Sequence, residues 1–90
     1  MSLRIVYMGT PAFAVPPLEA LASSGHDIVA VVSQPDRPSG RKMKVTPTPV
    51  HSAADRLGLP HHQPEKIRTE SYLEWLSGLQ PDLYVTAAYG

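Results

Sequence analysis

Residues 3–11 read Leu3-Arg4-Ile5-Val6-Tyr7-Met8-Gly9-Thr10-Pro11, and this stretch decides the fold. Its first residues are mostly bulky, β-branched or aromatic, and such side chains favour extended backbone. A nearly continuous apolar run predicts a strand covered on both faces, as in a parallel sheet between helices. The Gly-Thr-Pro segment then ends the strand. In an open α/β sheet, ligands bind at the carboxyl ends of the strands, so this turn is the first candidate for a site.

The composition limits what the chain can be. Ninety residues allow one small domain, and a formal net charge of zero gives no overall attraction to nucleic acid or membrane. The absence of cysteine excludes disulfides and thiolate metal sites and is consistent with a reducing compartment. We find no apolar run of about 18 residues and no basic segment followed by a long apolar block, so we expect neither a membrane span nor a signal peptide.

The next segment predicts a helix and a second strand. Pro16 and Pro17 fit the first turn of a helix, where no intrahelical N–H is needed, so we place the helix start near Pro16. We expect Gly25 to supply a left-handed cap at its end. Residues 27–32, DIVAVV, then form a buried strand. Strand, helix and strand within about thirty residues predict a right-handed βαβ unit with parallel strands.

Residues 33–49 break this pattern. Four prolines, at positions 35, 38, 47 and 49, together with Gly40, predict a segment without regular structure. A connection of this length is more often functional than decorative, and it starts at the same sheet edge as Gly9. Half of the eight basic residues lie in it: Arg37, Arg41, Lys42 and Lys44. They could be scattered charges on a solvated loop, or they could contact the phosphates of a nucleic acid.

The remainder predicts two helices and two strands. Thr48-Pro49 opens a helix that Gly58 caps, and residues 59–63 could hold a very short edge strand. Thr69 or Ser71 caps a third helix. The side chains expected on the buried face of that third helix are Tyr72, Leu73, Leu76 and Leu79. Residues 83–89 form the last strand.

These elements define an α/β fold with a partial doubly wound, Rossmann-like parallel sheet in strand order 3-2-1-4. The winding direction reverses between the first and last strands, and a substrate crevice is expected there. Its predicted residues are Gly9, Thr10, Pro11, Phe13, Ala88, Tyr89 and Gly90. Phe13 could equally be a core side chain or a wall of the crevice. Because the chain stops where the crevice should begin to fill, we expect it to be a fragment.

The residues point to no catalytic group and no metal ligand within the chain. The turn after the first strand lacks the three glycines of a dinucleotide-binding fingerprint. His51, His61 and His62 have no partners at metal-ligand spacing. A nucleophile elbow, a P-loop and a pair of catalytic carboxylates are also missing from the sequence.

The chain resembles the amino-terminal part of the methionyl-tRNA formyltransferase family. The resemblance covers essentially the whole sequence, from residues 4–15 to residues 87–90, and the block Gln34-Pro35-Asp36-Arg37-Pro38 is its most specific part. It implies that residues 1–90 are the amino-terminal, truncated part of a formyltransferase catalytic domain. Sugar-nucleotide formyltransferases share the Gly-Thr-Pro segment and remain an alternative, although the long basic loop favours the tRNA enzyme. A non-catalytic nucleotide- or RNA-binding module is the other alternative.

The resemblance also implies an activity. The complete enzyme transfers a formyl group from 10-formyltetrahydrofolate to the amino group of methionine on initiator tRNA. It implies a cytoplasmic protein, monomeric at full length, with no metal and no membrane partner. The family's catalytic residues would follow the equivalent of Gly90, so we expect these ninety residues alone to be inactive. Arg41 would meet the tRNA acceptor stem, assisted by Lys42 and Lys44.

Overall fold

The structure of the protein is a computed structural model that describes residues 2–39, 44–65 and 69–89. In chain order its elements are β1 (Arg4–Gly9), the 3-10 turn η1 (Ala12–Ala14), α1 (Val15–Ala22), β2 (Asp27–Val32), β3 (Arg37–Ser39), β4 (Lys44–Thr46), α2 (Pro49–Leu57), β5 (His61–His62), α3 (Glu70–Gly78) and β6 (Leu83–Ala87). Among the described helices, none is long and apolar enough to cross a bilayer.

Four strands form one parallel sheet in the order β5-β2-β1-β6. The predicted order 3-2-1-4 is therefore confirmed, with β5 as the third strand and β6 as the fourth. The pairing of β1 with β6 runs from Ile5 opposite Leu83 to Gly9 opposite Ala87. The first and last strands of the chain thus lie side by side and end at the same edge of the sheet, as the crevice hypothesis requires.

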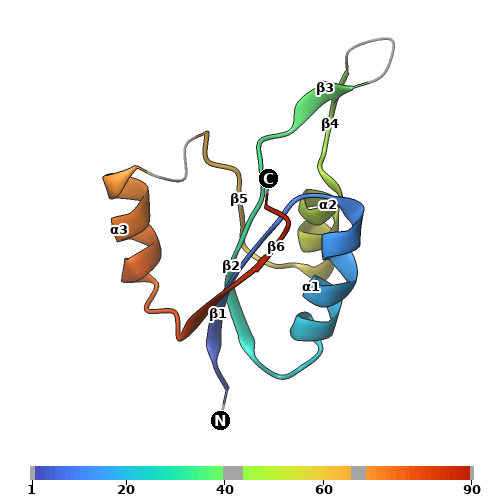
Figure 1. Ribbon diagram of the computed structural model, residues 1–90. Coiled ribbons are helices and arrows are strands. Elements are labelled where there is room, and N and C mark those ends of the chain that lie inside the picture. The colour runs from blue at the N-terminus through green and yellow to red at the C-terminus, as the bar shows by residue number, and fades with distance from the viewer. Residues whose placement is uncertain (1, 40–43, 66–68, 90) are drawn as a thin grey trace.

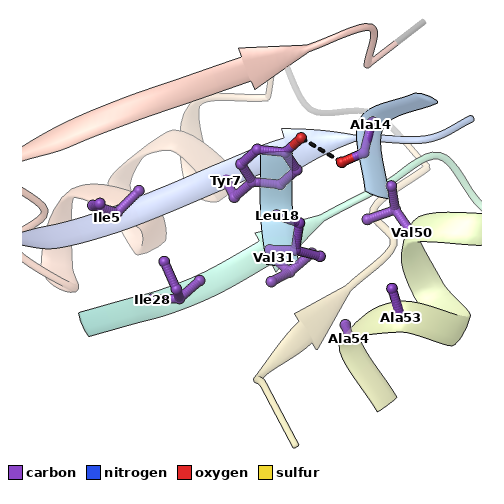
Figure 2. Packing of buried hydrophobic residues seen from close by; sticks show 9 residues of the cluster. All are labelled: Ile5, Tyr7, Ala14, Leu18, Ile28, Val31, Val50, Ala53 and Ala54. Atoms are coloured by element: carbon purple, nitrogen blue, oxygen red, sulfur yellow. Dashed lines mark hydrogen bonds between the residues drawn. The ribbon is translucent and has the colours of Figure 1, made fainter. Parts of the chain in front are cut away.

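Helices α1 and α2 cover one face of the sheet, and α3 covers the other (Figure 1). Figure 2 shows the first face, where side chains from β1 and β2 point toward the two helices. Tyr7 is fully buried there, and its hydroxyl donates a hydrogen bond to the Ala14 carbonyl at 2.6 Å. This bond satisfies the buried hydroxyl and ties η1 to β1.

Among the elements that the structure describes, only α3 covers the second face. Leu76 is buried against Val6, Ala30 and Val32 of the sheet. The prediction that Leu73 is also buried is wrong, because its side chain remains 49 % exposed. Residues on a helix are about 100° apart, so a residue three positions from Leu76 does not share all of its contacts when only one narrow stripe faces the sheet.

The prediction that residues 33–49 lack regular structure is wrong. Arg37–Ser39 and Lys44–Thr46 pair antiparallel, with Pro38 opposite Val45. A proline is compatible with a strand that has a free edge, because there its missing N–H costs no ladder bond. The pair forms a separate two-stranded sheet that projects from the main body (Figure 1). We call β3, β4 and the residues between them the basic hairpin.

The helix ends follow local chemistry with one exception. Thr48 caps α2 through its hydroxyl, and Gly58 ends that helix at φ 70°, as predicted. Of the two candidates for the start of α3, the structure selects Thr69, whose hydroxyl accepts the Tyr72 N–H. The predicted cap at Gly25 is wrong. Helix α1 ends at Ala22 with Ser23 as its cap, and Gly25 takes up its left-handed φ of 86° in the following turn.

Candidate functional site

The carboxyl ends of β1 and β6 are joined directly. The Thr10 N–H donates to the Ala88 carbonyl at 3.2 Å, and the Thr10 hydroxyl donates to the Tyr89 carbonyl at 2.5 Å. Three of the residues predicted for the crevice, Thr10, Ala88 and Tyr89, are therefore brought together across the sheet. The floor of the candidate crevice is a hydrogen-bonded unit and not two independent loops.

Gly9 makes this close approach possible. A Cβ atom built at Gly9 would lie 2.9 Å from the Ala14 Cβ and 2.9 Å from the Ala87 carbonyl oxygen. Neither neighbour is the flexible end of a long side chain. Gly9 is itself buried, so it lies beneath the candidate crevice, where β1, η1 and β6 meet.

Thr10 links this pair of strand ends to the rest of the edge. Its hydroxyl accepts the Gln34 N–H at 3.2 Å, just beyond β2, and its carbonyl accepts the Val50 N–H at 3.3 Å, in the first turn of α2. Thr10, which follows β1, is thus hydrogen-bonded to the segments that follow β2 and β6 and to the start of α2. A threonine suits this position, because its hydroxyl can donate one hydrogen bond, here to Tyr89, and accept another, here from Gln34.

The other predicted crevice residues differ in exposure. Phe13 is 69 % exposed, which excludes the core interpretation of its side chain in this part of the chain. Ala88 is exposed at φ 55°, a left-handed conformation that is uncommon for a residue with a Cβ. Tyr89 is half-buried, and burial raises the pKa of its phenol. Pro11 is also half-buried, and Gly90 lies outside the described residues.

The basic hairpin begins and ends at the same edge of the sheet. Arg37 lies in β3 opposite Thr46, and Lys44 lies in β4 opposite Ser39. Arg41 and Lys42 lie outside the residues that the structure describes. The backbone therefore gives two of the four predicted phosphate-binding residues a common support that leaves the main sheet next to the crevice floor.

A polar cluster between the hairpin and the sheet was not predicted. Its centre is Asp36, whose side chain is 17 % exposed. The carboxylate accepts hydrogen bonds from the Thr48 N–H at 3.0 Å, from His51 Nδ1 at 2.9 Å and from the Gln63 side-chain amide. Burial by itself raises the pKa of Asp36, but these hydrogen bonds outweigh it and hold that pKa below its usual value.

Only a weak sequence signal marks this cluster. Asp36 lies four residues beyond the carboxyl end of the buried strand β2, and Gln63 directly follows the short edge strand β5. Because carboxyl ends of parallel strands meet at one edge, polar residues just after them are candidates for contact. Their separation of 27 residues hides the pair from any local pattern.

A second pair, Ser33 with His61, lies beside this cluster. The Ser33 hydroxyl is 2.9 Å from His61 Nε2, and the ring of His61 stacks on that of His51 with centroids 4.1 Å apart. Burial, followed by the charge of His51, lowers the pKa of His61. The arrangement is not a catalytic triad, because the carboxylate and the hydroxyl contact different imidazoles and Ser33 is completely buried.

Residues 2–39, 44–65 and 69–89 contain no group of three or more His, Cys, Asp or Glu placed to hold a metal ion. What the described edge offers instead is hydrogen-bonded backbone at β1 and β6, an exposed aromatic ring and an adjacent basic hairpin. Such an edge can bind a substrate with an anionic part and can position it. Within the described residues we see no side chain arranged as a nucleophile or as a general base.

Comparison with known proteins agrees with this geometry. A family profile described as formyl transferase matches residues 3–90. Among curated proteins, a methionyl-tRNA formyltransferase from Listeria innocua is 62 % identical over 87 residues, which is 97 % of this chain and 28 % of that protein. The corresponding proteins from Bacillus velezensis and Listeria monocytogenes are 55 % and 60 % identical over the same length.

The chain therefore spans a little over a quarter of the length of the curated relatives that it matches. The matched region includes every element described above, from β1 to β6. With nearly all of its length matched by the family profile, and with the parallel sheet that the sequence predicts, the chain belongs to the formyl transferase family.

Proposed function

We propose that this chain is the amino-terminal part of the catalytic domain of an enzyme that formylates methionine on initiator tRNA. In this reaction the formyl group comes from 10-formyltetrahydrofolate and is received by the α-amino group of the methionyl residue. The observation that carries the proposal is the identity of 62 % to a methionyl-tRNA formyltransferase over 97 % of the chain. By the same resemblance, the complete protein would be a cytoplasmic monomer.

In this proposal the joined ends of β1 and β6 form the floor of the groove for folate and the methionyl end of the tRNA. Thr10 holds the two strand ends together through Ala88 and Tyr89. The exposed ring of Phe13 and the residue Pro11 would border the groove on the β1 side. The chain would contribute shape and positioning, and the groups that perform the transfer would come from elsewhere in the protein.

The basic hairpin would bind the tRNA backbone. Its proposed contact residues are Arg37, Arg41, Lys42 and Lys44. Arginine and lysine donate charge-assisted hydrogen bonds to phosphate oxygens, which fix the register of a nucleic acid without reading its sequence. Support comes from the antiparallel pairing of β3 with β4, which lets cations at both ends of the segment act on one ligand.

The reaction is tested with the protein that carries this chain. We expect it to formylate methionyl initiator tRNA in the presence of 10-formyltetrahydrofolate, and not to formylate the amino group of a uridine-nucleotide amino sugar. Turnover of the sugar nucleotide alone would identify a sugar-nucleotide formyltransferase. Tight binding of RNA without any folate-dependent product would identify a binding module.

The hairpin is tested separately by a substitution. Arg41→Ala should weaken binding of initiator tRNA by about 1–3 kcal/mol, the scale of a hydrogen bond to a charged group. It should also reduce the dependence of log Kd on log salt by about one unit. Arg56→Ala is the matched control, because Arg56 pairs with Glu19 at 2.8 Å on the helical face of α1 and α2. Equal salt slopes in the two variants would remove the hairpin from the tRNA site.

A further inference from the structure

The two ends of the basic hairpin are closed by a single carboxylate. Asp36 directly precedes β3, and Thr48 follows β4 by two residues. The Thr48 N–H donates to Asp36 Oδ1 at 3.0 Å, so the chain leaves and re-enters the body of the domain at one point. Thr48 is also the N-cap of α2, where its hydroxyl accepts the His51 N–H at 3.1 Å. The closure is therefore attached to the first turn of α2, a helix that packs on the sheet through Val50, Ala53 and Ala54.

The same carboxylate is held from the sheet and from α2. The Gln63 amide, just beyond β5, donates both to Asp36 and to the Gln34 carbonyl, the latter at 3.1 Å. His51 contributes its Nδ1 from α2 at 2.9 Å. Gln34 in turn donates its N–H to Thr10 on the crevice floor. We call Asp36, Thr48, His51 and Gln63 the clasp.

We propose that Asp36 is a positioning residue, which through the clasp fixes the direction of the basic hairpin relative to the β1–β6 crevice floor and so orients the hairpin's cations toward the phosphates of bound tRNA. This inference rests on the proposed function, since it assumes that the hairpin binds tRNA. It assigns the orientation of the hairpin to residues that need not touch the RNA themselves.

The donor set explains why a carboxylate suits this position. Three donors, two from the start of α2 and one from the residue after β5, converge on one side chain, and an ionised carboxylate is acceptor-only, with room for about four hydrogen bonds. An asparagine keeps one acceptor oxygen, so its NH₂ group would face His51 Nδ1, and this hydrogen bond would be lost unless the imidazole changed its tautomer. A buried donor left without an acceptor costs free energy, so the amide is expected to loosen the clasp although its shape is nearly the same.

A positioning role and a pure charge effect of Asp36 predict opposite changes in tRNA affinity. Asp36 adds a negative charge next to a hairpin that would bind an anionic ligand. If charge alone mattered, Asp36→Asn should strengthen tRNA binding, because it removes repulsion of phosphate. If Asp36 acts by positioning, the same substitution should weaken binding by about three- to tenfold. This is the scale of the free-energy cost of immobilising one or two long side chains when the complex forms.

The matched control is Asp55→Asn. Asp55 faces the other ring nitrogen of His51, with Oδ2 at 3.3 Å from Nε2, but it is 70 % exposed and makes no contact with the hairpin ends among the described residues. Both substitutions remove one negative charge near the same imidazole. We expect Asp55→Asn to leave tRNA affinity unchanged or slightly higher, while Asp36→Asn lowers it.

A measurement without tRNA tests the clasp apart from the proposed function. Amide hydrogen exchange in the protein that carries this chain should become at least about tenfold faster at Thr46 and Thr48 in Asp36→Asn, because the hairpin base opens more often. Exchange at Val31, in the centre of the sheet, should not change. If exchange accelerates but tRNA affinity does not fall, the proposal that the hairpin binds tRNA is wrong. If exchange at Thr48 is unaltered, the clasp itself is refuted.

A like-charge contact provides the second variant. Gln63→Glu places a second carboxylate against Asp36 and removes the donor to the Gln34 carbonyl, so it should open the clasp. We expect exchange at Thr46 and Thr48 to accelerate in Gln63→Glu as it does in Asp36→Asn. Exchange at Thr48 as slow as in the original protein would overturn the proposal.

Discussion

The substitution Gly9→Ala tests how tightly β1 and β6 are joined. The added methyl would lie 2.9 Å from both the Ala14 Cβ and the Ala87 carbonyl oxygen, and 3.2 Å from the ring of Tyr7. Contacts shorter than about 3 Å require a shift of backbone here, because η1 is tied to β1 and β6 is hydrogen-bonded to it. Overpacking of this kind costs about 1–3 kcal/mol. Replacing glycine in a strand by alanine gains roughly 0.5–1 kcal/mol, which offsets part of the cost.

We therefore expect Gly9→Ala to lower the free energy of unfolding by about 1–1.5 kcal/mol, the middle of the overpacking range, about 2 kcal/mol, less a gain of roughly 0.5–1 kcal/mol in strand propensity. Urea unfolding of the protein that carries this chain, followed by circular dichroism, measures this value. The control is Gly78→Ala near the end of α3, where a Cβ meets nothing within 4 Å. It should be neutral or stabilising by up to roughly 1 kcal/mol, as expected for alanine replacing glycine in a helix.

A double-mutant cycle identifies which contact matters. Ala14→Gly removes one of the two atoms that the new methyl would meet. If the clash is real, Gly9→Ala combined with Ala14→Gly should lose less stability than the sum of the two single changes, by at least about 0.5 kcal/mol. Additive effects, or a Gly9→Ala protein as stable as the original, would show that the strand ends are not packed as described.

Three further predictions concern the helix cap, the clasp and the left-handed residue. Thr69→Ala should lower stability by about 1 kcal/mol in thermal or urea unfolding, and Ser71→Ala should have little effect, because Thr69 is the residue that caps α3. The stability that Asp36 contributes should be complete above the ordinary aspartate pKa near 4 and should disappear as the pH falls through its lower folded-state pKa, so the difference between wild type and Asp36→Asn should shrink below about pH 4. Ala88→Gly should raise stability by up to about 1 kcal/mol in urea unfolding by relieving the left-handed φ of 55°, and Gln80→Gly, at φ 53° and far from the crevice, should do the same; a loss at both positions would contradict the strain argument.

The expected loss of the Asp36 contribution in acid follows from the sign of linkage. A group whose pKa is lower in the folded state than in the unfolded state binds fewer protons when folded. Protonation therefore favours the unfolded chain over the range between the two pKa values. His61 acts in the same direction at higher pH, since its pKa is also lowered and its neutral ring is the form that the fold favours. Stability should thus begin to fall below about pH 6.5, the ordinary pKa of histidine.

The strands and helices of the main body were predictable because their signals are local. The apolar run of β1, the β-branched run of β2 and the Thr-Pro start and Gly end of α2 each lie within about ten residues. Parallel pairing and the order β5-β2-β1-β6 then follow from general rules on crossover connections. The exposed position of Leu73 was not predictable, since it depends on how much of α3 the sheet covers.

The sequence by itself determined the α/β class, the strand order, the turn at Gly9 and the concentration of basic residues at the same sheet edge. Only the tertiary structure decided that residues 37–39 and 44–46 pair, that Thr10 joins β1 to β6, and that Asp36 closes the hairpin with Thr48 and Gln63. The physical reason is distance along the chain. Periodicity and capping act between neighbours, whereas the bonds of Asp36 span 12 to 27 residues and form only after the sheet has brought their segments together.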